Sequence, residues 1–373
     1  MAHEPRLSVF YDDVFLTHEA PDGTFEYPAD DHLAVTEPHP DRPARLRNVK
    51  RTIETALADY STWESVTPAT RDQLEAVHDP DYLDEFEAFC ARGGGRVTLS
   101  TAANEATYEA ARHAAGATVQ AAMRALETDG SEVPYALVRP SGHHAQPAQW
   151  DGYCFINNAA VAAEHALATG AVERVAIVDW DVHPGNGTQE VFYDRDDVLF
   201  VSLHNDFGAW DPETHPQTGG LEEVGVGDGE GYTVNVPLPP GTGDAGYGYA
   251  FERLVEPVVA AFDPDLLLVS AGQDGGIIDP SARNMLTKDG FHDLGERMRR
   301  LADAHADGSL VVVQEGGYQI SHLAFATLGV LEGVLGVETD VEDPFAALDE
   351  YLPPARTWVD EAVAAYADYW PLS

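Results

Sequence analysis

Several polar residues follow apolar segments of this chain, and their types are those that bind metal ions and move protons. Asp179, Asp181 and His183 come directly after or just beyond the apolar segment 175–178. Side chains alternate along a strand, so these three would share one face if the extended conformation continues. A carboxylate and an imidazole two residues apart can bind one divalent cation. A strand end with solvated acids and a capping Asp is the alternative interpretation.

Three further groups occupy the same kind of position: the His-His pair at 143–144, Asp274 and Tyr318. Each alone is equally typical of a capped or packed loop. The carboxyl ends of parallel strands meet at one edge of a sheet, so their joint position favours a single site. Tyr318 follows two glycines that permit close approach, and its hydroxyl could donate a hydrogen bond to an oxyanion.

Together these residues contain the parts of a catalytic metal site. Asp181, His183 and Asp274 would supply three ligands and leave a coordination position open, as in catalytic zinc sites. His143 and His144 have the intrinsic pKa that proton transfer near neutral pH requires.

The segments between these groups alternate between strand and helix, which predicts an α/β protein with a mostly parallel sheet and helices on both faces. Residues 12–44 are expected to form a long loop at the rim of a site. The predicted strands are 7–11, 134–138, 175–178, 198–203, 233–237, 266–270 and 310–314. The predicted helices are 44–58, 67–78, one ending near 92, 102–127, 157–169, 246–262, 289–305, one ending near 335 and one in the tail after 340.

The charge balance is unusual: 64 acidic against 21 basic residues give a net charge of −43, and only two of the bases are lysines. Self-repulsion on this scale destabilises a compact state in dilute buffer, whereas molar salt shortens the screening length to about 3 Å. The composition is similar to that of proteins from salt-loving archaea. An acidic surface for a basic partner is the alternative, and nucleic-acid binding is disfavoured in both cases.

Composition also bears on compartment and domain organisation. Cys90 and Cys154 are far apart and no CxxC motif occurs, which indicates a reducing, cytoplasmic compartment. The N-terminus lacks the apolar core of a signal peptide, and no apolar run reaches membrane-spanning length. We expect a single catalytic domain over 1–373, with a core at about 7–336 and an acidic extension at 337–373 that packs on the body. The oligomeric state stays open, with a homo-oligomer as one possibility.

Four motifs, in their order along the chain, resemble the histone deacetylase superfamily. They are Arg-Pro-Ser-Gly-His-His-Ala from residue 139, Asp-Trp-Asp-Val-His-Pro-Gly-Asn-Gly-Thr from 179, Ser-Ala-Gly-Gln-Asp from 270 and Glu-Gly-Gly-Tyr from 315. Segments 152–158 and 236–242 are similar to its class II-like branch, which includes bacterial deacetylase-like amidohydrolases and acetylpolyamine amidohydrolases. The resemblance runs from about 7 to 336. It implies a three-layer arginase/deacetylase-like fold and one zinc ion.

The resemblance also implies roles for individual residues. The zinc ligands would be Asp181, His183 and Asp274. The catalytic residues would be His144 as general base and acid with Asn186 as its partner, His143 as the electrostatic histidine backed by Asp179, and Tyr318 as the oxyanion donor.

Two further sites follow from the same resemblance. Gly152 and Tyr153 would line the acyl channel. A structural potassium site would be formed by main-chain oxygens of Asp179, Asp181 and His183, together with Ser202 and Leu203. Ser100 stands where the family often has an Asp that fixes the substrate backbone, which leaves small acetylated amines open as substrates.

The sequence therefore predicts a zinc-dependent amidohydrolase that deacetylates N-acetylated amines. Acetylpolyamine hydrolysis is the closest alternative. A di-manganese ureohydrolase shares the fold, but the order Asp-x-Asp-x-His argues against it. A non-enzymatic acyl-group reader would need a damaged site, whereas every catalytic position is filled.

Overall fold

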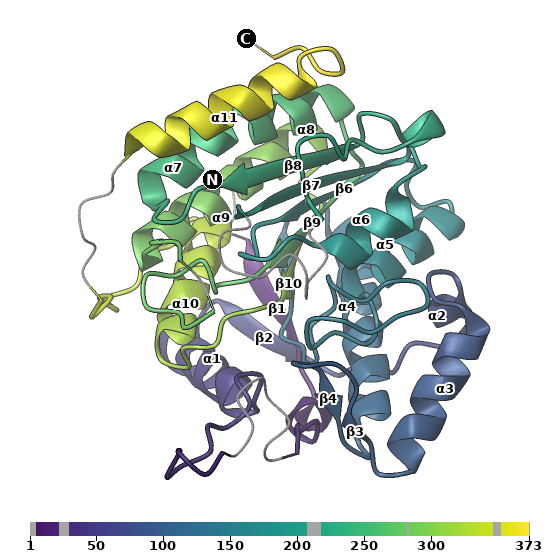
Figure 1. The fold of residues 1–373 in the computed structure, drawn as a ribbon. Helices are drawn as coiled ribbons and strands as arrows, with labels where there is room; N and C mark the ends of the chain where they lie inside the picture. Colours follow the sequence, from purple (N-terminus) through teal and green to yellow (C-terminus); the bar gives the residue numbers. More distant parts are fainter. Residues whose placement is uncertain (1–4, 22–29, 207–217, 282, 346–351, 373) are drawn as a thin grey trace.

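The computed structural model describes residues 5–21, 30–206, 218–281, 283–345 and 352–372. Within them, eight parallel strands form one sheet in the order β2-β1-β5-β10-β9-β6-β7-β8 (Figure 1). Their bounds are β1 Arg6–Phe10, β2 Ser61–Glu64, β5 Glu132–Ala136, β6 Val175–Asp179, β7 Val198–Asn205, β8 Thr233–Leu238, β9 Leu266–Ala271 and β10 Leu310–Gln314. A short antiparallel pair, β3 Gly95–Arg96 and β4 Ala102–Ala103, stands apart from this sheet.

Helices cover both faces of the sheet (Figure 1). On one face, α4 (Thr107–Thr128) and α5 (Asn158–Ala168) pack on the strands and on each other. On the other, α9 (Lys288–His305) packs with α10 (His322–Leu335), which also contacts α1 (Ala44–Ala56). The remaining α-helices are α2 Arg71–Glu75, α3 Pro80–Ala91, α6 Asn186–Phe192, α7 Asp244–Ala250, α8 Glu256–Phe262 and α11 Leu352–Tyr366. The predicted α/β class is confirmed.

The central strands are apolar because both faces of the sheet are covered. Every residue of β6 and of β9 is buried. Asp179 at the end of β6 pairs with Ser202 of β7 on one side and with Ser270 of β9 on the other. The end of β9 in turn pairs with the end of β10. The turns that follow these strands therefore emerge at one edge of the sheet.

Some element predictions were wrong in detail. The helix predicted over 67–78 begins only at Arg71, because Thr70 and not Thr67 is the N-cap, in a capping box with Gln73. The helix predicted from 102 begins at Thr107, since residues 102–103 form β4. Strand β2 and helix α6 were not predicted.

The long polar segments largely lack regular structure. Residues 12–44 contain a 3-10 turn, Asp13–Leu16, and residues 22–29 of this predicted loop lie outside the described residues. Residues 207–217, which follow β7, also lie outside the described residues. None of the described helices is long and apolar enough to cross a membrane.

The C-terminal helix α11 contacts β8 and α7. The Tyr366 hydroxyl accepts a hydrogen bond from Asn235 N at 2.6 Å, and Trp370 Nε1 donates to Gly231 O at 2.9 Å. Both aromatic side chains are buried. The acidic C-terminal segment is thereby anchored through its apolar residues.

The net charge gives a prediction about stability. Because self-repulsion of the −43 chain is screened by salt, the thermal unfolding midpoint should rise steeply between dilute and molar potassium chloride. Differential scanning calorimetry over this range measures the effect. A midpoint that does not change with salt would favour an acidic surface for a basic partner instead.

Candidate active site

Three predicted ligands converge at the carboxyl edge of the sheet. Asp181 and His183 lie in the turn after β6, and Asp274 lies in the turn after β9. Their donor atoms are all within 4.8 Å of one another. His183 Nδ1 is 3.1 Å from Asp181 Oδ1 and 3.2 Å from Asp274 Oδ2. Both carboxylates are fully buried, whereas the His183 side chain is 18% exposed.

Asp179 does not join this cluster. The extended conformation ends at Asp179, and residues 181–183 bend, so the three residues do not share one strand face as the alternation suggested. The Asp179 carboxylate accepts from Asp181 N at 3.0 Å and lies 2.9 Å from His143 Nδ1. The bend therefore separates Asp181, a possible metal ligand, from Asp179, whose carboxylate orients His143.

The charges of the cluster fit a cation. Burial and the charge of Asp181 raise the pKa of Asp274 to about 7. Burial opposes ionisation of Asp181, but His143 and His183 outweigh it and hold the pKa of this carboxyl below its usual range. Asp274 Oδ2 accepts no hydrogen bond from the described residues. A divalent cation would satisfy this oxygen and relieve the repulsion, so two carboxylates and an imidazole suit zinc.

Two glycines allow the strand ends to approach these carboxylates. A Cβ at Gly272 would lie 2.3 Å from Asp181 Oδ2, and one at Gly316 would lie 2.2 Å from Asp274 Oδ2. Gly316 N also donates to Asp181 Oδ2 at 2.8 Å. Any side chain at either position would displace a carboxylate.

The tandem histidines stand beside the cluster, with ring centroids 4.0 Å apart. His143 Nε2 is 3.6 Å from Asp181 Oδ1, and His144 Nδ1 is 2.5 Å from Asn186 Oδ1. Burial opposes the charge on His143, but Asp181 and Asp179 outweigh it and raise its pKa well above the ordinary value. Burial, His143 and His183 lower the pKa of His144 well below it. The two neighbours are therefore suited to opposite protonation states.

Tyr318 follows β10 and lies against Tyr153, with ring centroids 5.5 Å apart in an edge-on arrangement. Burial raises the pKa of Tyr318 well above its ordinary value, so its hydroxyl keeps its proton and can donate. Asp279 Oδ2 accepts from Tyr318 N at 2.6 Å and holds the turn. Gly152, in the left-handed region at φ +47°, has no room for a side chain, because a Cβ would lie 2.1 Å from His144 Cδ2.

A buried ion network under the site was not predicted. Arg45 Nη1 and Arg139 Nε donate to the same oxygen, Asp41 Oδ1, at 2.5 and 2.8 Å. Arg45 also donates to Gly317 O and lies 4.8 Å from the Tyr318 ring centroid. The helix predicted over 44–58 contains Arg45, but its sequence does not indicate which strand ends this side chain contacts.

The potassium prediction concerns backbone oxygens beside this site. Asp179 and Ser202 are paired across β6 and β7, and Leu203 is the next residue of β7. Ser202 Oγ is 2.9 Å from His204 Nδ1. The potassium site stays a prediction.

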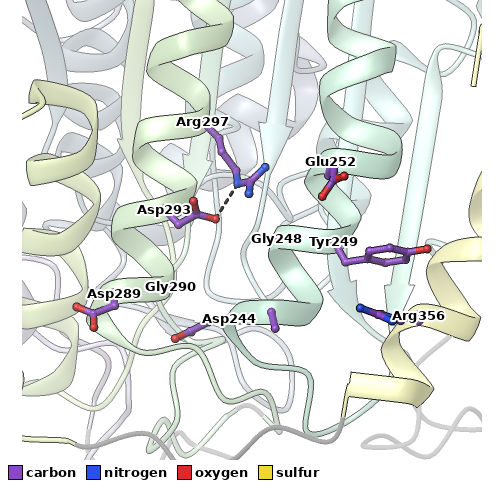
Figure 2. A pocket seen from close by; sticks show the side chains of 10 residues that line it. Asp244, Gly248, Tyr249, Glu252, Asp289, Gly290, Asp293, Arg297 and Arg356 are labelled. Carbon is purple, nitrogen blue, oxygen red and sulfur yellow. Dashed lines mark hydrogen bonds and ion pairs between the residues drawn. The ribbon is translucent and has the colours of Figure 1, made fainter. Parts of the chain in front are cut away.

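A pocket of about 460 Å³ lies between α7, α9 and α11 (Figure 2). It shares no lining residue with the site described above. Its Arg297 already forms ion pairs with Asp293 and Glu256, both at 2.7 Å. We assign this pocket no role.

A parallel sheet that gathers buried carboxylates and imidazoles at its carboxyl edge has the arrangement of an α/β enzyme, in which the active site lies at this edge. Residues 39–334 match the histone deacetylase domain family. The chain is 40% identical over 370 residues to histone deacetylase 8 of Arabidopsis thaliana, covering 98% of both chains. It is 38% identical over 358 residues to a histone deacetylase-like amidohydrolase of Pseudomonas aeruginosa, covering 95% of this chain and 93% of the relative.

The solved structure of the HDA15 HD domain matches with a TM-score of 0.85 and 33% identity, covering 99% of this chain and 96% of that one. The chain therefore belongs to the histone deacetylase family, as its motifs predicted, and is a hydrolase that acts on amide bonds. Its fold is the deacetylase-like α/β fold.

The cluster gives a prediction about metal retention. Asp181→Asn keeps the shape of the side chain but removes its charge, so the purified variant should lose zinc that the parent retains at one ion per chain. Elemental analysis after gel filtration in molar potassium chloride measures this. The exposed Asp196→Asn is the matched control. Full zinc retention in Asp181→Asn would contradict the ligand assignment.

Proposed function

We propose that this chain is a zinc-dependent amidohydrolase that removes acetyl groups from N-acetylated primary amines. The observation that supports this most is geometric: His143, held by Asp179, and His144, held by Asn186, stand beside a buried donor cluster. Membership of a family of deacetylases agrees with it. Asp181, His183 and Asp274 would hold the ion. The ion would supply Lewis acidity, which polarises an amide carbonyl and lowers the pKa of water to about 7.

His144 is the proposed general base. The amide oxygen of Asn186 can only accept, so His144 Nδ1 carries its hydrogen toward Asn186 and Nε2 is left as a proton acceptor. The lowered pKa keeps this imidazole neutral and able to take the proton of an attacking water. The same residue can then return the proton to the leaving amine.

His143 and Tyr318 are proposed to stabilise the transition state. His143, whose Nδ1 pairs with Asp179, would hold a proton beside the reacting atoms. Tyr318 donates a hydrogen bond to the tetrahedral oxyanion that forms on the acetyl carbon. Arg45 lies against the Tyr318 ring and bonds the carbonyl of Gly317, which fixes the direction of this donor.

Substrate selection is proposed to depend on the channel wall and its rim. Tyr153 packs against Tyr318 and also against His39, whose ring centroid is 4.8 Å away. His39 Nε2 is 2.8 Å from Ser100 O, which places Ser100 at the same rim. Ser100 brings no negative charge to the backbone of a peptide substrate. Both acetyl-lysine peptides and small acetylated amines are therefore candidate substrates.

A turnover screen tests the proposed function. Acetyl-lysine peptides and acetylated polyamines are compared in molar potassium chloride with zinc-loaded protein, and release of acetate is measured. We expect turnover of at least one class, and the ratio of kcat/KM values assigns the substrate. No turnover of either class, together with measurable binding of the acetylated compounds, would favour the acyl-group reader.

Tyr318→Phe separates catalysis from binding. The substitution keeps the ring and its packing and removes one donor, so kcat should fall by on the order of 10²–10³ while substrate affinity changes much less. Zinc should remain bound, because Tyr318 is not a proposed ligand. Tyr11→Phe is the control, because the Tyr11 hydroxyl donates to Asp13 and neither residue belongs to the proposed site. An unchanged kcat in Tyr318→Phe would remove this residue from the mechanism.

A further inference from the structure

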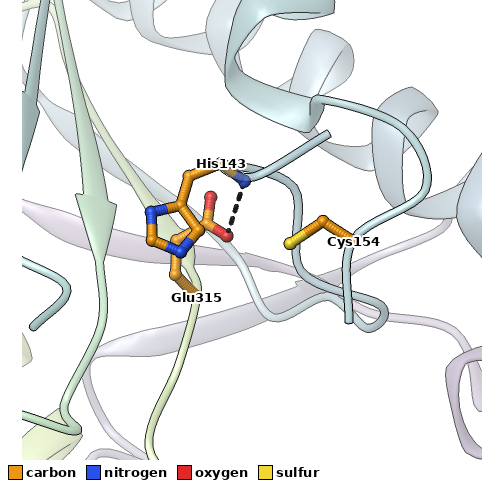
Figure 3. Close-up of side chains that lie close together, drawn as sticks. All are labelled: His143, Cys154 and Glu315. Atoms are coloured by element: carbon orange, nitrogen blue, oxygen red, sulfur yellow. Dashed lines mark hydrogen bonds between the residues drawn. The ribbon is translucent and has the colours of Figure 1, made fainter. Parts of the chain in front are cut away.

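A second group of buried side chains lies beside the tandem histidines: His143, Cys154 and Glu315 (Figure 3). Their donor atoms are within 4.8 Å of one another, and all three residues are buried. Glu315 directly follows β10 and stands three residues before Tyr318. Glu315 is not among the predicted catalytic or metal-binding residues.

The chemistry of this group does not favour a second metal ion. Burial raises the pKa of the Cys154 thiol well above its ordinary value, so the thiolate that a metal requires is disfavoured. His143 Nδ1 is already paired with Asp179. A different role for Glu315 follows from its hydrogen bonds.

The Glu315 carboxylate connects two turns of the site. Its Oε2 accepts from Gly142 N at 2.7 Å and from His143 N at 3.3 Å, and Figure 3 shows the second of these contacts. The backbone carbonyl of the same residue accepts from Arg45 Nη2 at 2.6 Å. Hydrogen bonds to an ionised carboxylate are stronger than those between neutral groups, and these are fully buried.

We propose that Glu315 is a positioning residue whose side chain fixes the tandem-histidine turn, residues 140–144, against the turn that carries Tyr318. The inference rests on the proposed function, because it concerns the geometry of that reaction. One end of Glu315 belongs to the Tyr318 turn, and the other bonds the backbone of His143 itself. A single residue therefore sets how the proposed base and electrostatic histidine stand relative to the proposed oxyanion donor.

The second carboxylate oxygen fits this role. Glu315 Oε1 has no hydrogen-bond partner among the described residues. Burial raises the pKa of Glu315 to about 7. A proton on Oε1 leaves the lone pairs of Oε2 available to both backbone donors. The two hydrogen bonds that link the turns can therefore also form when Oε1 is protonated.

The test compares three variants of the zinc-loaded protein. Glu315→Met keeps the length but removes the acceptor, and we expect kcat to fall by on the order of 10–100-fold with little change in KM, because small misplacements of reacting groups are costly. Glu315→Gln restores an acceptor oxygen, so its kcat should be within about threefold of the parent, with the same shape of pH profile. Glu332→Met controls for general destabilisation, because Glu332 is another buried glutamate, which lies in α10 and pairs with Lys288 of α9.

Hydrogen exchange of the backbone amides in residues 141–146 gives a readout that does not need turnover. We expect faster exchange in Glu315→Met than in the parent, and parental exchange in Glu315→Gln. A parent that deacetylates nothing would count against the proposed function, while this measurement would still decide the role of Glu315.

Three results would overturn the inference. The first is a parental kcat and parental exchange in Glu315→Met. The second is a Glu315→Gln variant as slow as Glu315→Met, because the charge and not the acceptor geometry would then matter. The third is a parent with two zinc ions per chain that falls to one in Glu315→Met, which would assign a second metal site.

Discussion

The structure depends on the burial of carboxylates at the ends of β6 and β9. Asp179, Asp181 and Asp274 are all fully inaccessible to solvent, and an unpaired buried charge costs several kcal/mol even after relaxation. The protein meets this cost with imidazoles, with backbone N–H groups and, in the proposed function, with a divalent cation. The glycines at 272 and 316 are required because no side chain fits beside the carboxylates. The strands therefore end next to the cluster of Asp181, His183 and Asp274. The contacts of this cluster determine the positions of the turns around it.

A second buried network of charged residues connects the turn of the tandem histidines with the turn that carries Tyr318. Asp41 accepts from both Arg45 and Arg139, and each of the three is at most 2% exposed. Arg45 bonds the carbonyls of the Tyr318 turn, while Arg139 precedes the turn of the tandem histidines. Residues from the N-terminal third of the chain thus fix two turns that belong to different strands. Removing Asp41 would leave two buried guanidinium groups without their shared carboxylate, so this residue is costly to replace.

The sequence predicted where the buried strands end and which polar residues follow them. It did not predict the backbone bend, the short helix or the long-range hydrogen bonds that connect these strand ends. Unbroken apolar segments marked the buried strands, and the polar residues after them marked the site. The bend after Asp179 was not predicted, because alternation says nothing of where an extended segment stops. Helix α6 was missed since the Pro-Gly-Asn-Gly segment reads as a turn, although its Asn186 begins a helix. The contacts of Glu315 could not be predicted, because Gly142 and His143 lie more than 170 residues away in the chain. The pairing of Asp41 with Arg139 spans 98 residues and gave no local signal either.

In the proposed function, one divalent cation at Asp181, His183 and Asp274 makes this chain a deacetylase. Stripping the protein with a chelator and titrating zinc back in molar potassium chloride, with acetate release from an acetylated substrate as the readout, tests it most directly. The account predicts no turnover in the metal-free protein and a rise that saturates at one zinc ion per chain. Full turnover in verified metal-free protein, or saturation only at two ions per chain, would contradict it.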